Sequence, residues 1–207
     1  MVKIVIVGNA RRENLAHWSK VTDECDLVIA CDGAIENCLS SGIKVDVLIG
    51  DMDSIDAPTL EYAKLNSIEV IQIPDQGNND LSKALSHAKT LQPNVIDIIG
   101  VDGGKSDHQF ANYMTLIEAP VEARILLDDC VVFCVNSSSS VTYSIEINQE
   151  FSLFSVGQST GVTLAGGKWE LNNATLQPGS YGLHNIAISD HITVSCETGS
   201  LLVFVNR

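Results

Sequence analysis

Aspartates and glycines gather at four points of the chain, each directly after a short apolar run. These segments run from Cys31 to Ala34, Gly50 to Ser54, Asp75 to Asp80 and Gly100 to His108. Crowded carboxylates raise one another's pKa and destabilise a fold unless a cation lies between them. Mg²⁺ binds carboxylate oxygens and completes its shell with substrate phosphates, which glycine backbone can approach closely. The pattern therefore predicts a Mg²⁺–nucleotide site for phosphoryl-type transfer.

Each piece of this pattern also has an ordinary structural explanation. Asp80 and Asp107 each open a predicted helix, where an aspartate often serves only as an N-cap. Gly103 and Gly104 would suit a simple turn, and His108 would suit a satisfied polar residue in a first helical turn. The coincidence of four such segments at successive strand ends favours the catalytic interpretation.

The first part of the chain alternates unbroken apolar runs with helix-like segments. Unbroken β-branched runs are typical of parallel strands covered by helices on both faces. We therefore expect an α/β domain with a doubly wound, mostly parallel, Rossmann-like sheet, whose strand ends border the ligand crevice. The expected strands are 3–7, 27–31, 45–49, 69–73 and 95–99, and the expected helices are 14–20, 34–41, 58–65, 80–89 and 107–119. The turn from Gly8 to Arg12 is a plausible phosphate loop but matches neither common nucleotide-binding glycine pattern.

A polar stretch from Asn136 to Ser140 is predicted to link two domains or to form an exposed loop. The remaining chain shows short strand patterns separated by turn signals and no comparable helix, which predicts a small all-β sandwich or barrel. We expect domains at 1–135 and 136–207, the first carrying the ATP and Mg²⁺ site. The expected strands of the second are 151–156, 161–164, 169–171, 192–196 and 201–205.

Composition excludes several classes of partner. The 207 residues hold 26 acidic and 12 basic side chains, a formal net charge of −14. Scarce Lys and Arg argue against binding to nucleic acid or to an anionic membrane. No apolar run approaches the roughly 20 residues that span a bilayer, and the N-terminus is more typical of a strand than of a signal peptide. The six cysteines are expected to be reduced, buried thiols of a cytoplasmic protein.

The same motifs resemble those of the thiamin pyrophosphokinases. The family pattern A-D-G-G, G-D-x-D-S, D-Q…T-D and G-G-R-x-D-H-x-x-x-N is similar in order and spacing to segments of this chain. They are Cys31–Ala34, Gly50–Ser54, Asp75–Asp80 and Gly103–Asn112. Gly167–Leu171 resembles a tryptophan-containing segment of the family's β-rich thiamin-binding domain, so the resemblance covers nearly the whole chain.

The resemblance implies a thiamin diphosphokinase that moves the pyrophosphoryl group of Mg-ATP to the hydroxyl of thiamin, releasing AMP. It also implies a homodimer with thiamin bound near the subunit interface. Asp51, Asp53 and Asp80 would hold Mg²⁺ and, with Asp107, form the catalytic set. Asp32, Gly33, Ser54, Gln76, Asn79, Gly103, Gly104, Lys105 and His108 would bind the nucleotide. Asn112, Trp169, His184 and Asn185 would bind thiamin.

Some positions depart from the family pattern. Lys105 replaces an arginine, which keeps the charge but loses the planar fork, and Asn79 replaces a threonine, which can also cap a helix. His184 replaces a serine in the second domain. Trp169 would either stack on a thiamin ring or pack in the core, whereas Trp18 is expected to pack.

Three other functions fit parts of the pattern. A pyrophosphokinase acting on another alcohol, such as a pterin, would share the first domain. A metal-dependent phosphatase with Asp51 as nucleophile would need the aspartate pair at the end of the first strand, whereas here it follows the third. A non-catalytic thiamin- or nucleotide-binding protein would not require the whole aspartate set. The residue types leave open which aspartate accepts the proton of the attacking hydroxyl.

Overall fold

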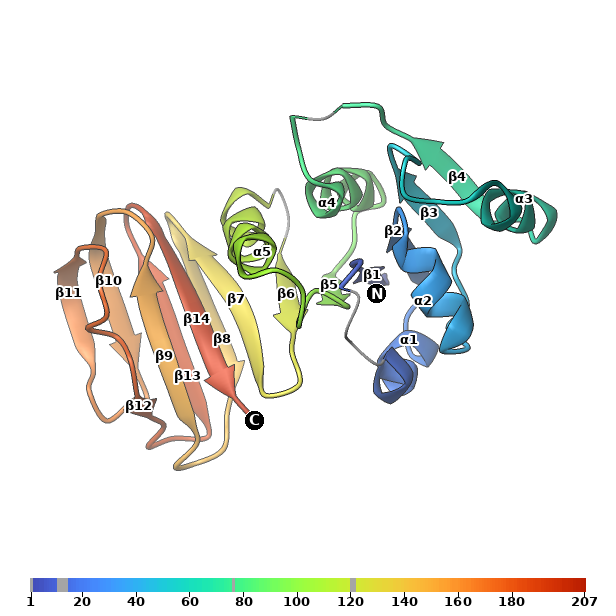
Figure 1. The fold of residues 1–207 in the computed structure, drawn as a ribbon. Coiled ribbons are helices and arrows are strands. Elements are labelled where there is room, and N and C mark those ends of the chain that lie inside the picture. Colours follow the sequence, from blue (N-terminus) through green and yellow to red (C-terminus); the bar gives the residue numbers. More distant parts are fainter. Residues whose placement is uncertain (1, 11–14, 76, 120–121) are drawn as a thin grey trace. The chain divides into compact units, whose positions relative to one another are not determined.

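The computed structural model describes residues 2–10, 15–75, 77–119 and 122–207. The chain forms two compact units, 1–125 and 126–207 (Figure 1). Residues 126–135 belong to the second unit, because strand β7 (Cys130–Asn136) pairs along its whole length with β14 (Ser200–Asn206). The sequence-based boundary, after residue 135, would separate these two paired strands.

The first unit is built on a parallel sheet with the strand order β6-β5-β1-β2-β3-β4. The unbroken apolar runs lie at its centre, and Ile4, Ile6 and Ile29 are fully buried. All five expected strands are present, and β6 is a further strand. The bounds are β1 (Lys3–Val7), β2 (Leu27–Cys31), β3 (Val47–Gly50), β4 (Glu69–Gln72), β5 (Val95–Ile99) and β6 (Ala123–Leu126).

Helices cover both faces of this sheet, which confirms the doubly wound α/β fold. Figure 1 shows α4 (Asp80–Thr90) and α5 (Ser106–Glu118) on one face, with α1, α2 and α3 on the other. The bounds of the latter are α1 (Ser19–Asp23), preceded by the 3₁₀ turn η1 (Leu15–Trp18), α2 (Ala34–Ser40) and α3 (Ala57–Leu65). Trp18 is buried, as expected. None of the helices in the described part of the chain is long and apolar enough to cross a bilayer.

The path of α4 explains why its first turn reaches the centre of the unit. The helix connects β4, at the edge of the sheet, with β5 on the far side of β1, and it contacts β1, β2 and β3 on the way. Leu81, Ala84, Leu85 and Ala88 form its buried face, as their amphipathic spacing predicts.

The second unit is an all-β sandwich of two antiparallel layers, as predicted. One has the order β12-β9-β14-β7 and the other β11-β10-β13-β8. Phe151, Leu153, Val162, Val194 and Val203 share its core. The new bounds are β8 (Ser139–Ser144), β9 (Glu150–Ser155), β10 (Ser159–Ala165), β11 (Leu171–Leu176), β12 (Asn185–Ile186) and β13 (His191–Cys196).

Two sequence-based interpretations in this unit are wrong. The stretch from Asn136 to Ser140 is not a linker: Ser138 makes a turn at φ +60°, and β8 begins at Ser139 and pairs with β13. Its serines resemble a linker in composition, but they lie at a sheet edge where alternate side chains face solvent. Trp169 is not in a strand, because β11 begins at Leu171. The prediction for the cysteines is confirmed in part: all six are free thiols, but Cys25 and Cys134 are only half-buried, whereas the other four are buried.

Candidate functional site

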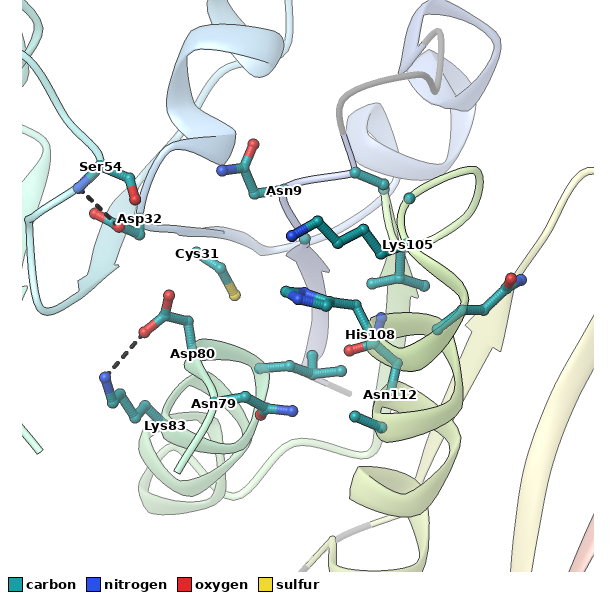
Figure 2. A pocket seen from close by; sticks show the side chains of 18 of the residues that line it. Asn9, Cys31, Asp32, Ser54, Asn79, Asp80, Lys83, Lys105, His108 and Asn112 are labelled. Carbon is teal, nitrogen blue, oxygen red and sulfur yellow. Dashed lines mark hydrogen bonds and ion pairs between the residues drawn. The ribbon is translucent and has the colours of Figure 1, made fainter. Parts of the chain in front are cut away.

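A pocket of about 1030 Å³ lies at the carboxyl ends of the parallel strands of the first unit (Figure 2). The loops after β1, β2, β3 and β5 line it, together with the first turns of α4 and α5. The chain leaves β1 toward α1 on one face and β5 toward α5 on the other (Figure 1). Ligand crevices form at such a switch point because neighbouring loops diverge.

Two glycines allow the backbones after β1 and β5 to come close at this point. A Cβ on Gly8 would lie 2.9 Å from the carbonyl oxygen of Gly100, and a Cβ on Gly100 would lie 2.7 Å from that of Gly8. Gly100 also has φ +70°, which favours glycine. The Gly8 amide donates to the Ile99 carbonyl and the Ala10 amide to the Gly100 carbonyl, so hydrogen bonds fix the backbone in this part of the pocket.

Three carboxylates from the loops after β2 and β3 form a tight acidic group. Oxygens of Asp32, Asp51 and Asp53 all lie within 4.8 Å of one another. Gly50 makes room for this arrangement, because a Cβ there would lie 2.8 Å from the Cβ of Asp32. The glycine that precedes the Asp51–Asp53 pair is thus required by packing against Asp32.

Asp32 is the buried member of this group, with only 3% of its surface exposed. Its Oδ2 accepts a hydrogen bond from the Ser54 amide at 3.3 Å. Its Oδ1 is buried and has no hydrogen-bond partner among the described residues. Burial raises the pKa of Asp32 most, and the charges of Asp80 and Asp51 raise it further. A backbone φ of +37°, uncommon for an aspartate, holds the side chain there.

The acidic group fits a hard divalent cation. Mg²⁺ takes oxygen ligands and is usually held by one or two carboxylates plus water and phosphate. The unpaired Oδ1 of Asp32 and the two more accessible carboxylates of Asp51 and Asp53 provide oxygens of this kind. Asp80, the third ligand expected from the sequence, lies outside the group but lines the same pocket.

The start of α4 forms a second wall of the pocket. Asn79 caps the helix: its Oδ1 accepts from the Ser82 amide at 2.8 Å, and its Nδ2 donates to the Thr115 hydroxyl of α5 at 3.0 Å. The cap is therefore Asn79, and Asp80 is free of that role. Asp80 instead accepts a hydrogen bond from the Lys83 ammonium at 3.0 Å (Figure 2).

The start of α5 forms the third wall and carries the other predicted side chains. Gly103 has φ +71°, and its amide donates to the Asp102 side chain, which also accepts from Gln109. Lys105 is the N-cap residue without a side-chain cap bond. Helix N-termini attract anions through free amides and the helix dipole. Gly104, Asp107, His108 and Asn112 line the pocket beside it.

The remaining predicted residues of the first unit are placed as follows. Ser54 and Asn79 line the pocket. Gly33 is not among the residues that line the pocket, and a Cβ there would lie 2.7 Å from the side-chain nitrogen of Asn9. Gln76 lies outside the described residues, as do the two arginines of the expected phosphate loop at 8–12.

The predicted thiamin residues Trp169, His184 and Asn185 belong to the second unit. Trp169 is not a core residue, because it is 55% exposed, and the Lys168 ammonium lies 4.8 Å from its ring centroid. Asn185 is buried, and both ends of its amide bind the backbone of Trp169, at 3.2 and 2.9 Å. Asn185 therefore fixes the turn that presents Trp169. His184 is exposed and has φ +63°.

Among the residues that line the pocket, Lys83 was not singled out from the sequence, and Asn9 and Cys31 lie in segments that were singled out but received no role in the site. Cys31 ends β2 and Asn9 lies two residues after the end of β1, so their position at the sheet edge could have identified them. Lys83 gave one usable signal, since it lies three residues after Asp80 on a predicted helix, a spacing at which opposite charges meet.

Known proteins match both units. Residues 18–127 match the family of thiamin pyrophosphokinase catalytic domains. Residues 142–201 match the family of thiamin pyrophosphokinase vitamin B1 binding domains. Thiamine pyrophosphokinase 1 of rice (Oryza sativa subsp. japonica) is 31% identical over 151 residues, covering 67% of this chain and 56% of the rice protein. The aligned part therefore spans less than two thirds of that relative.

Two further comparisons extend over more of the chain. Thiamine pyrophosphokinase 1 of Arabidopsis thaliana is 26% identical over 196 residues, covering 88% of this chain and 73% of that protein. The crystal structure of thiamine pyrophosphokinase from Bacillus subtilis superposes with a TM-score of 0.83 at 25% identity, covering 99% of this chain and 98% of the other. With both domain descriptions matched in order, this chain belongs to the thiamin pyrophosphokinase family.

Proposed function

We propose that this protein transfers the pyrophosphoryl group of Mg-ATP to the hydroxyl of thiamin, giving thiamin diphosphate and AMP. The observation that carries the proposal is the strand-end pocket. It combines an acidic group suited to a divalent cation with a glycine-rich helix N-terminus suited to phosphates. Membership of the thiamin pyrophosphokinase family supports this choice among phosphoryl-transfer reactions.

Asp51 and Asp53 would hold Mg²⁺ with Asp32 beside them, and Asp80 would complete the acidic wall from α4. When bound, Mg²⁺ supplies positive charge that offsets the charge of the phosphate oxygens. The amide of Gly104 and the Lys105 ammonium would donate to those oxygens, beside the turn at Gly103. Little covalent work is left for the protein, so its contribution is to orient the reactants and balance charge.

The reaction balances without any further reactant. The hydroxyl oxygen of thiamin forms a bond to the β-phosphorus of ATP. The bond from that phosphorus to the oxygen bridging to the α-phosphate breaks, and AMP departs with that oxygen. The proton of the hydroxyl passes to a pocket carboxylate, among which Asp107 and Asp80 stand at the helix starts.

We further propose that the second unit supplies part of the thiamin site. Its match to a vitamin B1 binding domain and its exposed Trp169 support this assignment. An aromatic ring of this kind stacks well on a flat heterocycle. His184 of the same unit would contribute a polar contact. The family resemblance favours a homodimer, which light scattering would test by its mass. The free thiols favour a cytoplasmic location.

The deciding experiment follows AMP release from Mg-ATP with and without thiamin and identifies the product by mass. Thiamin-dependent AMP release with thiamin diphosphate as product is the expected result. AMP release without thiamin dependence would keep the pyrophosphoryl-transfer site but assign the acceptor to another alcohol, such as a pterin. ADP or free phosphate as the product would contradict the proposed reaction.

A further inference from the structure

Lys83 is a buried lysine at the edge of the pocket. It lies on α4, its side chain is only 5% exposed, and its Nζ is 3.0 Å from Asp80 Oδ1. Lysines on helices ordinarily extend their stem so that the ammonium reaches water, and they are rarely buried unless paired. Figure 2 shows the ammonium directed at the Asp80 carboxylate. The cost of removing the Lys83 charge from water must therefore be offset by its ion pair with the Asp80 carboxylate.

The surroundings of Lys83 are dominated by negative charge. Burial alone would lower the pKa of its ammonium, but the hydrogen bond and charge of Asp80, with the charges of Asp51 and Asp75, outweigh burial and raise it. Lys83 is therefore charged at neutral pH. Asp80 takes one of its three N–H donors, and Nζ makes no other hydrogen bond within the described residues.

Asp80 shares the pocket with the carboxylates of Asp32, Asp51 and Asp53, and the Lys83 ammonium is the cation that contacts it. The charges of Asp80 and Asp51 both act on Asp32, whose Oδ1 already lacks a partner among the described residues. The cap by Asn79 fixes the backbone of Asp80, but it makes no contact with the carboxylate itself. Among the contacts of Asp80 in the described residues, the one with Lys83 therefore orients the carboxylate and offsets its charge.

We propose that Lys83 is a positioning residue: its ammonium is the built-in counter-cation that fixes the Asp80 carboxylate before metal or nucleotide arrives. The catalytic consequence rests on the proposed pyrophosphoryl transfer, whereas the electrostatic role does not. Lys83 offsets the repulsion among the carboxylates. When the lysine charge is removed, a divalent cation bound to the acidic group would therefore offset part of this repulsion.

The first test compares thermal unfolding of wild type, Lys83→Met and the matched control Lys89→Met, an exposed lysine of the same helix. Without metal, Lys83→Met should lower Tm by on the order of 10 °C, because it leaves a partly buried carboxylate unpaired. Saturating Mg²⁺ should raise Tm of Lys83→Met more than that of wild type, so that the difference in Tm between the two proteins becomes smaller. The proposal would be overturned if Mg²⁺ left the Tm difference between Lys83→Met and wild type unchanged, or if Lys89→Met lowered Tm as much as Lys83→Met.

A double variant separates charge from packing. If Lys83 acts through Asp80, then Asp80→Asn with Lys83→Met should unfold at a higher temperature than Lys83→Met alone, because it removes the unpaired charge. A double variant as unstable as the sum of the single losses would mean that Lys83 is only a packed side chain. This comparison needs no activity, so it stands even if the proposed reaction fails.

The catalytic readout is the split between kcat and KM. A misdirected Asp80 should lower kcat by about 100-fold, while KM for thiamin changes little. Lys83→Arg, which keeps the charge, should recover part of the lost kcat. A rise in KM for thiamin with unchanged kcat would contradict a positioning role at Asp80. Wild-type protein without AMP release would instead contradict the proposed function and leave the stability tests valid.

Discussion

The two units differ in how they satisfy their buried polar groups. In the second unit, both ends of the Asn185 amide bind backbone, and the buried hydroxyls of Ser155 and Ser159 pair at 2.7 Å. In the first unit, Asp32 keeps a buried oxygen without a partner among the described residues, next to two other carboxylates. Buried polar atoms are nearly always paired in native proteins. The contrast indicates that the unpartnered oxygen of Asp32 and its neighbouring carboxylates are available to a cationic ligand.

The second unit uses a different kind of surface. Its exposed large side chains include Trp169, Tyr181 and Leu183, and the Asn185 amide holds the turn that presents Trp169. Such a surface suits a flat organic ring, whereas the pocket of the first unit suits a metal-bound phosphate chain. Each of the following predictions changes one side of this comparison.

The largest effect is expected from Asp53→Asn. Removing this exposed carboxylate should lower the rate of AMP release by about 10³-fold, because charge stabilisation at transferring phosphates is lost. Tm without metal should stay the same or rise, because the substitution removes one of three neighbouring like charges. Steady-state kinetics and circular dichroism check both. Unaffected activity in a folded variant would mean that this carboxylate is outside the working site.

Leu153→Ala tests whether the two regions can be weakened separately. Leu153 is buried in the sandwich core, and its truncation should destabilise the second unit by about 3 kcal/mol. Mn²⁺ binding to the acidic group of the first unit, measured by calorimetry, should be unchanged. Weakened Mn²⁺ binding would show that the acidic group depends on the packing of the sandwich.

Trp169→Ala should have a moderate effect confined to one substrate. Loss of ring stacking should raise KM for thiamin by about 3- to 10-fold and leave KM for ATP unchanged. Because Trp169 is 55% exposed, Tm should hardly move. Trp18→Ala is the contrasting variant, since that side chain is buried in the first unit and its loss should lower Tm. An equal rise in both KM values would contradict a thiamin-specific contact.

The smallest effect concerns the exposed cap of α3. Hydrogen bonds from Thr59 hold the pKa of Asp56 below its ordinary value of 3.8. The folded state therefore gains stability above the unfolded-state pKa and loses it as pH falls through the lower folded-state pKa. Asp56→Ala should lower Tm slightly at neutral pH, and the difference from wild type should shrink in acid. A difference that grows in acid would contradict this assignment.

Much of the first unit could be predicted because its signals are local. Unbroken apolar runs identified the five strands, and the polar segments after them marked one edge of the sheet. Lys83 could not be predicted in this way, because a lysine on an amphipathic helix normally points to water. Its burial depends on α4 crossing the sheet to reach β5.

The second unit was harder to predict because its strands are short and partly polar. β8 reads as a serine-rich linker, and only its pairing with β13 makes it a strand. The pairing of Asn185 with the Trp169 backbone joins residues 16 positions apart through a turn that has no sequence pattern. Long-range pairing of this kind is invisible to local periodicity.

The most direct test of the central claim follows each phosphate of ATP into the products. ATP labelled in turn at the α-, β- and γ-phosphate would be incubated with thiamin and Mg²⁺. We predict the α label only in AMP and the β and γ labels together in thiamin diphosphate, with all transfer strongly reduced in Asp53→Asn. The γ label alone on thiamin, or released as free phosphate, would contradict pyrophosphoryl transfer at this pocket.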